Sequence, residues 1–106
     1  MEDKPRRSKV PGTVPSGDIY KLRLFVAGAS PNSIKAINNL KEICERHIAG
    51  LYSLEIIDIY QEPALAKKEQ IIALPLLIKK SPGAERRLIG DLSDTGKVLK
   101  ALSIIP

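Results

Sequence analysis

The stretch from residue 20 to residue 33 constrains the fold of this chain more than any other. Apolar side chains occupy every second position of its first part, at Tyr20, Leu22, Leu24 and Val26. This period of two is typical of a β-strand with one buried face. Ser30 is then a good helix N-cap, and Pro31 suits the first helical position, where its missing N–H costs nothing. The stretch therefore predicts a strand that leads directly into a helix.

Periodicity and turn residues predict the remaining elements in the same way. In chain order they indicate a helix that ends near Gly50, a strand over residues 51–60, a short helix over 63–70, a strand over 76–78, a turn over 81–84, a strand over 86–89 and a helix capped by Ser93. Residues 51–60 are almost continuously apolar, which predicts a strand covered on both faces. The order β-α-β-α-β-β-α is that of a thioredoxin-like domain of the α/β class, with its first two strands parallel.

A chain of 106 residues supports one small domain. Residues 1–17 contain three prolines and show no hydrophobic period. We therefore expect a disordered basic tail there and a folded domain over residues 18–106. The single cysteine excludes an intrachain disulfide. Since no apolar run is long enough for a signal peptide or a membrane span, we expect a cytoplasmic protein.

The formal net charge of +5 raises the question of a nucleic-acid partner. Proteins that bind single strands combine a basic groove with aromatic side chains on which bases stack. Arg23 close to Phe25 is the only such combination in this chain. A solvated basic surface explains the charge better, and we expect no nucleic-acid partner.

The turn between the first strand and the first helix is where a thioredoxin carries its redox CxxC motif. Residues 29–32 of this chain read Ala-Ser-Pro-Asn. The helix N-terminus that would lower a thiol pKa is predicted, but both sulfurs are missing, which excludes thiol–disulfide exchange by this route. Pro75 precedes a predicted strand at the point where thioredoxin-like folds hold a cis-proline, so a cis peptide bond is the expectation from the fold.

Cys44 lies on the predicted apolar stripe of the first helix, where a buried thiol is usually inert. A catalytic dyad with His47 would need an exposed thiol held in a cleft, and we expect this histidine simply to lie near the helix C-terminus. Asp58, Asp91 and Asp94 form no recognisable acid pair or metal cluster, and Asp91 is expected to support the turn before it. We therefore predict no catalytic residue, no cofactor and no bound metal.

Six basic residues are candidate contacts for an acidic partner: Lys67, Lys68, Lys79, Lys80, Arg86 and Arg87. The first two lie on the predicted short helix and the other four on the predicted hairpin. A run of charges is most often just a solvated face. Both interpretations stay open at this point.

Several segments in a defined order resemble the KaiB family of circadian-clock proteins, at residues 20–33, 50–52, 57–58, 63–66, 71–77 and 87–94. The resemblance covers roughly residues 19–103, and the order and spacing of the segments are more specific than any one of them. It implies a thioredoxin-like fold and a protein that acts by binding another protein rather than by catalysis. It also favours the six basic residues as contacts, because this part of a KaiB chain helps to form the partner surface.

The resemblance implies particular partners and two states. KaiB proteins bind the N-terminal ATPase ring of KaiC, and in cyanobacteria the bound form recruits KaiA. They also compete for that ring with a thioredoxin-like sensor domain of an output histidine kinase. The family is metamorphic: one state is a tetramer whose C-terminal half has a different helix–strand order, and the binding-competent state is a thioredoxin-like monomer.

This chain departs from the family pattern in the segments that switch, which include Pro75, Pro82, Gly83, Ala101 and Ser103. The usual proline cluster of the hairpin is reduced to one proline, and the final segment has alanine and serine where typical members have glycine and aspartate. Alanine favours a helix over glycine by about 1 kcal/mol. The usual longer, acidic C-terminus is also missing. We therefore expect the thioredoxin-like monomer to dominate, with a weak or absent tetramer.

Three hypotheses for function follow from the sequence. The leading one is a non-enzymatic clock regulator that docks on a KaiC-like ATPase. The second is a thioredoxin-like sensor or adaptor module in a stress or two-component signalling pathway, without a clock function. The third is an enzyme that uses Cys44 as a single-cysteine peroxidase or transferase.

Overall fold

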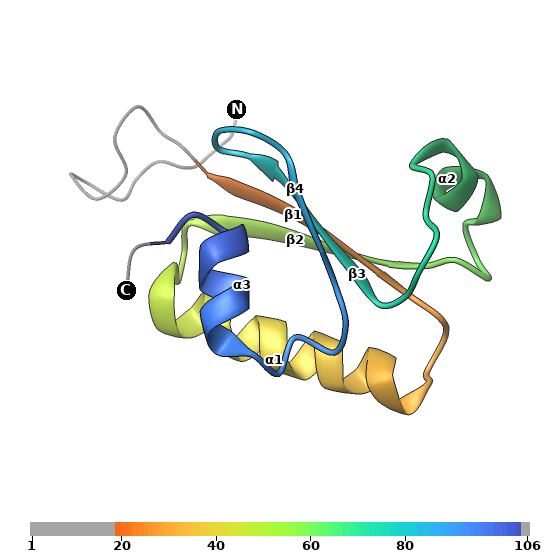
Figure 1. The fold of residues 1–106 in the computed structure, drawn as a ribbon, viewed down its shortest axis with the longest axis horizontal. Helices are drawn as coiled ribbons and strands as arrows, with labels where there is room; N and C mark the ends of the chain where they lie inside the picture. Colours follow the sequence, from red (N-terminus) through yellow and green to blue (C-terminus); the bar gives the residue numbers. More distant parts are fainter. Residues whose placement is uncertain (1–18, 105–106) are drawn as a thin grey trace.

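The computed structural model describes residues 19–104, so the tail predicted over residues 1–17 lies outside the described residues. The described part contains seven elements in the predicted order (Figure 1). They are β1 (Tyr20–Val26), α1 (Pro31–His47), β2 (Tyr52–Asp58), α2 (Pro63–Lys68), β3 (Leu76–Ser81), β4 (Arg86–Ile89) and α3 (Thr95–Ala101). The predicted thioredoxin-like order of elements is confirmed.

The four strands form one mixed sheet in the order β2-β1-β3-β4. β1 runs parallel to β2 and antiparallel to β3, and β4 returns beside β3 as its antiparallel hairpin partner. α1 is the crossover that joins the two parallel strands, as the strand–helix–strand pattern predicts. β1 and β3 therefore lie at the centre of the sheet.

One face of the sheet is covered by α1 and α3, which lie on the same side in Figure 1. We term it the helix-covered face. Its buried residues are Leu22, Leu24, Val26, Ala36, Leu40, Ile43, Cys44, Ile48, Leu77, Leu92, Val98, Leu99 and Leu102. Burying one leucine or isoleucine of this kind stabilises a fold by roughly 1.5–3 kcal/mol. Most of the apolar stabilisation of the described chain therefore comes from this face.

The opposite face is covered over only part of its length, and we term it the open face. It carries a second, smaller buried cluster of Phe25, Ile57, Leu76 and Ile78. Leu65 of α2, with Ile71 and Leu74 of the loop that follows, packs on this cluster. Figure 1 shows α2 at one end of the sheet, apart from the other two helices. The alternation in β1 predicts a single strongly buried face, but Phe25 is also fully buried because the α2 segment covers it.

The prediction that residues 51–60 form a strand covered on both faces is wrong. β2 is one of the two edge strands, and Ile57 is the only one of its seven residues that is buried. Ile56 is 39% exposed. The elements that cover the two faces reach only part of an edge strand, so a nearly continuous apolar run does not guarantee burial there.

The last helix begins one residue later than predicted. Its N-cap is Asp94, not Ser93, and Asp94 Oδ1 accepts a hydrogen bond from the N–H of Lys97 at 3.2 Å. The N–H of Ser93 donates to Asp91 Oδ1 at 3.0 Å, so the Asp91 side chain supports the turn that follows it rather than the predicted turn before it. Serine and aspartate are about equally good N-caps. Because the Asp91 turn already uses the backbone of Ser93, the cap falls to the next residue.

Candidate partner-binding surface

The turn between β1 and α1 uses its hydroxyl groups to start the helix. Ser30 Oγ accepts from the N–H of Ser33 at 3.3 Å and donates to Ser33 Oγ at 2.8 Å. The N–H of Ala27 donates to the same Ser33 oxygen at 3.0 Å. The Leu74–Pro75 peptide bond beside this turn is cis, as expected. The position of a redox motif is therefore occupied by an ordinary helix cap.

Cys44 is fully buried on the helix-covered face. Burial, with a smaller effect from the charge of Glu45, raises the pKa of the Cys44 thiol to about 12. The thiol is therefore protonated near neutral pH, and a thiol in this state is a poor nucleophile. His47 is exposed at the last turn of α1, as predicted, so the two side chains do not form a dyad held in a cleft.

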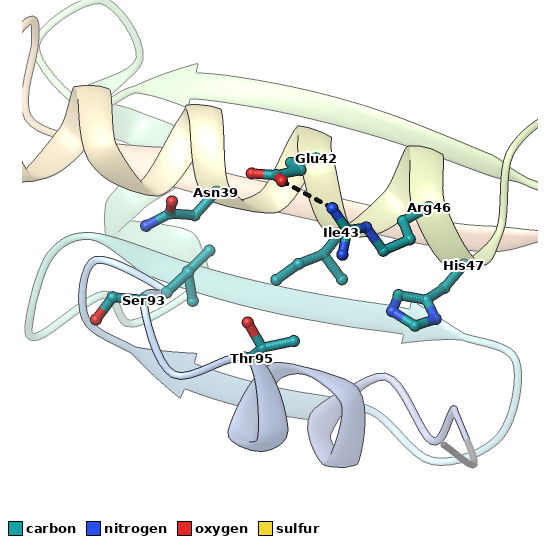
Figure 2. Close-up of a pocket in the computed structure, with 8 residues that line it drawn as sticks. Asn39, Glu42, Ile43, Arg46, His47, Ser93 and Thr95 are labelled. Atoms are coloured by element: carbon teal, nitrogen blue, oxygen red, sulfur yellow. Dashed lines mark hydrogen bonds and ion pairs between the residues drawn. The ribbon is translucent and has the colours of Figure 1, made fainter.

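A small hollow of about 110 Å³ lies between α1 and the start of α3 (Figure 2). Arg46 on its rim pairs with Glu42 of the same helix at 3.2 Å, and Asn39 Nδ2 donates to the backbone oxygen of Asp91 at 2.9 Å. The Asn39 bond joins α1 to the loop before α3, and we assign the hollow a packing role. Among residues 19–104, no three His, Cys, Asp or Glu side chains come together as metal ligands would.

The six basic residues predicted as contacts differ in their availability. Lys67 and Lys68 are exposed at the last turn of α2, and Arg86 and Arg87 are exposed on β4. Lys80 is half-buried. Lys79 is 1% exposed and its ammonium donates to the backbone oxygen of Pro82. Burial, followed by the positive charge of Arg86, lowers the pKa of Lys79, so its ammonium is not displayed on the surface.

Glu69, the C-cap residue of α2, is the centre of an ion-pair cluster on the open face. Its side chain is 13% exposed. Its Oε2 lies 3.2 Å from Arg23 Nη1 and 3.1 Å from Lys80 Nζ, and its Oε1 lies 3.3 Å from Arg87 Nη2. Arg87 Nη1 also donates to the backbone oxygen of Glu69 at 2.9 Å. We term these four residues the Glu69 cluster, in which β1, β3 and β4 each provide one cation.

Two further carboxylates flank the Glu69 cluster. Glu55 of β2 lies 3.1 Å from Arg23 Nε. Glu85, in the hairpin turn, lies 3.5 Å from Lys80 Nζ and 3.3 Å from Arg87 Nε. The hydrogen bond from Arg87, and then the charge of Lys80, lower the pKa of Glu85. A continuous series of ion pairs thus reaches from β2 to the β3–β4 hairpin across the open face.

Sequence reasoning missed Arg23 and Glu69 as members of one surface. Arg23 Nη1 and Glu69 Oε2 meet across 46 positions of the chain, which no local pattern reveals. One signal was present, since the period of β1 places Lys21 and Arg23 on the face opposite Leu22 and Leu24.

The residues predicted to bear on fold switching lie in two places. Pro75 immediately precedes β3 and follows a cis bond. Pro82, also after a cis bond, shares the hairpin turn with Gly83 at φ +75°. Ala101 is the last residue of α3, and Ser103 follows it in the left-handed region at φ +62°. No helix within residues 19–104 combines the length and apolar character needed to cross a membrane.

Comparison with known sequences gives consistent matches. The KaiB domain family model matches residues 23–104. The chain is 49% identical over 86 residues to the circadian clock oscillator protein KaiB of Prochlorococcus marinus subsp. pastoris, which covers 81% of this chain and 80% of that protein. KaiB of Trichodesmium erythraeum is 46% identical, with 81% and 83% covered.

Comparison with solved structures gives two kinds of match. The N-terminal domain of Synechococcus elongatus SasA superposes with a TM-score of 0.67 at 27% identity, and the match covers 92% of this chain and 93% of that domain. Chloroplastic thioredoxin z superposes with a TM-score of 0.64 at 19% identity, covering 81% and 80%. The second match, at this low identity, shows a shared thioredoxin-like fold and nothing further.

Proposed function

The chain belongs to the KaiB family, and from this membership we propose that it is a non-enzymatic clock regulator that docks on the N-terminal ATPase ring of a KaiC-like protein. One observation carries the proposal: β3, β4 and α3 have the thioredoxin-like arrangement, which the family resemblance associates with the binding-competent state. KaiA and a clock-output histidine kinase are the further partners in this proposal, and the cytoplasm is its location.

The end of α3 supports a dominant thioredoxin-like monomer. The N–H of Ser103 donates to the oxygen of Lys100 at 3.0 Å, and the N–H of Ile104 donates to the oxygen of Leu99 at 2.9 Å. This pair of bonds is a Schellman motif, which satisfies carbonyl groups that the helix leaves unpaired. Ala101 adds about 1 kcal/mol of helix preference over a glycine. Both features favour a final helix over a final strand.

The proposed contact surface consists of four exposed basic residues and the half-buried Lys80, all on α2 and the β3–β4 hairpin: Lys67, Lys68, Lys80, Arg86 and Arg87. Lys79 is left out because its ammonium is directed to Pro82. Among the described residues, Lys67, Lys68 and Arg86 form no ion pair within 4.0 Å, so their charges are available to an acidic partner.

The test is size-exclusion chromatography with light scattering on the full chain, alone and mixed with a KaiC-type ATPase plus nucleotide. We expect a monomer of 11.6 kDa that co-elutes with the ring within minutes of mixing. Lys68→Glu should weaken co-elution, while Lys35→Glu on the exposed side of α1 should leave it unchanged. A mainly tetrameric protein would contradict the proposed dominance of the thioredoxin-like state.

A second candidate function is a sensor or adaptor module without a clock role. The match to the SasA N-terminal domain, over 92% of this chain, supports this candidate in one respect: it shows a similar thioredoxin-like domain as one part of another protein. A stable monomer that never binds a KaiC-type ring would favour this second function and would leave the fold assignment intact.

A further inference from the structure

The Glu69 cluster has the composition of a carboxylate-binding site. Arg23, Lys80 and Arg87 come from three different strands and place four donor contacts within 3.3 Å of the two oxygens of a single carboxylate. Charge-assisted bonds of this kind, particularly those from arginine, are the usual means by which proteins recognise carboxylates. In the free chain the carboxylate is the protein's own Glu69.

Glu69 is held by a segment that is weakly anchored. α2 has six residues, none of them buried, and its N-cap residue Glu62 makes no side-chain capping bond. Leu65 is the one α2 residue that packs, half-buried, on the small apolar cluster of the open face. The three cations, by contrast, stand on strands that pair within the sheet. Withdrawal of Glu69 therefore disturbs much less structure than displacement of any of its partners.

A groove of about 370 Å³ leads along the open face to this site. Its charged lining consists of Lys21, Arg23, Lys68, Lys80, Glu55 and Glu69, so that cations outnumber carboxylates by four to two. Lys21 and Lys68 form no ion pair within 4.0 Å among the described residues. This charge balance is complementary to an acidic peptide segment and opposes a basic one.

We propose that Arg23, Lys80 and Arg87 form a recognition site for an acidic segment of a partner protein, and that Glu69 fills this site as an internal ligand until the partner's carboxylate replaces it. Glu69 is then an autoinhibitory contact: it lowers the affinity of the basic surface and ties the end of α2 to the sheet. The inference rests on the proposed function in one respect: it assumes that the acidic segment belongs to the protein on which this chain docks.

The experiment measures binding of a fluorescein-labelled octaglutamate peptide to the full chain by fluorescence anisotropy at low ionic strength. Glu69→Gln removes the competing charge and keeps the side-chain shape, so the variant should bind the peptide about tenfold more tightly than the wild type. Glu62→Gln is the matched control, because it removes one exposed charge from the other end of α2. Equal or weaker binding by Glu69→Gln, or equal gains in both variants, would overturn the inference.

A second measurement does not depend on a variant. In wild-type protein titrated with octaglutamate, the side-chain N–H resonances of Arg23 and Arg87 should shift together, because the Nη groups of both side chains lose Glu69 and gain a new carboxylate. Peptide binding that leaves both resonances in place would locate the peptide elsewhere and overturn the inference. If octaglutamate binding behaves as expected but no KaiC-type ring binds, the recognition site stands and the proposed function fails.

Discussion

The helix-covered face and the open face share the same four strands but use them differently. Within the described residues, the first buries thirteen apolar side chains and the second buries four. The rest of the open face carries ion pairs, each of which is weak and weakened further by salt. Apolar burial ties α1 and α3 to the sheet, whereas α2 is held by the partly buried Leu65 and by the ion pairs of Glu69. Most of the apolar core and the proposed recognition site thus lie on opposite sides of the same strands.

The largest effect that tests this comparison comes from a core truncation. Leu40→Ala removes a fully buried side chain from the helix-covered face and should lower the free energy of unfolding by about 3 kcal/mol. Ile72→Ala, in the loop that follows α2, removes a side chain that is 90% exposed and should change it by less than about 0.5 kcal/mol. Urea unfolding of both variants measures the difference. Similar losses in the two would remove the distinction between the faces.

An intermediate effect concerns the ion pairs themselves. Glu69→Gln leaves three partly buried cations without their shared carboxylate and should cost about 1 kcal/mol of unfolding free energy at low salt. This cost should shrink at about 1 M salt, where charges are screened over a few ångströms. Urea unfolding at the two salt concentrations provides the measurement. A loss that is independent of salt would assign Glu69 a packing role instead.

A comparable effect is expected at the end of α3, with opposite signs at two neighbouring sites. Ala101→Gly should weaken the helix by about 1 kcal/mol. Ser103→Gly should strengthen it by up to about 1 kcal/mol, because Ser103 occupies the left-handed region that glycine adopts without strain. Thermal unfolding and light scattering report both changes. The tetramer fraction should be larger in Ala101→Gly than in Ser103→Gly. If it is not, the helix preference of this segment does not determine the equilibrium between monomer and tetramer.

The smallest effect is a pH dependence at Lys79. Its pKa in the folded chain is lowered by burial, so between that value and the ordinary value of 10.5 the unfolded chain holds more protons. Stability conferred through this residue should therefore rise as the pH increases through that window. In Lys79→Met this group is absent, so the variant lacks this pH dependence. As the pH rises through the window, the unfolding free energy of the wild type should therefore increase relative to that of the variant. A difference that stays constant with pH would contradict the burial of the ammonium.

The helix-covered face is the part that the sequence predicts well. The alternation in β1 and the apolar stripe of α1 are local periods, and a buried face follows directly from them. The prediction for β2 failed because its apolar run is local whereas its position at the edge of the sheet depends on the topology of the whole chain. The N-cap of α3 failed for a smaller reason, since two adjacent residues are both good caps.

The open face is the part that sequence reasoning could not assemble. Lys80 and Arg87 were found as basic residues, but their shared partner Glu69 was not, because the contact joins segments that come together only in the folded sheet. Lys79 and Lys80 are adjacent and chemically identical in the sequence, and strand alternation turns one toward the helix-covered face and the other toward Glu69. These two lysines therefore do not belong to one surface.

The pairing of β1 with β3 is the only place within the sheet where the N-terminal and C-terminal halves of the chain meet, and its register shifts between Lys21 and Leu22. Outside the sheet the same two halves share one buried cluster, in which α1 and α3 both take part. A second arrangement of the C-terminal half, as the family resemblance implies, would therefore have to break both the β1–β3 pairing and this apolar contact.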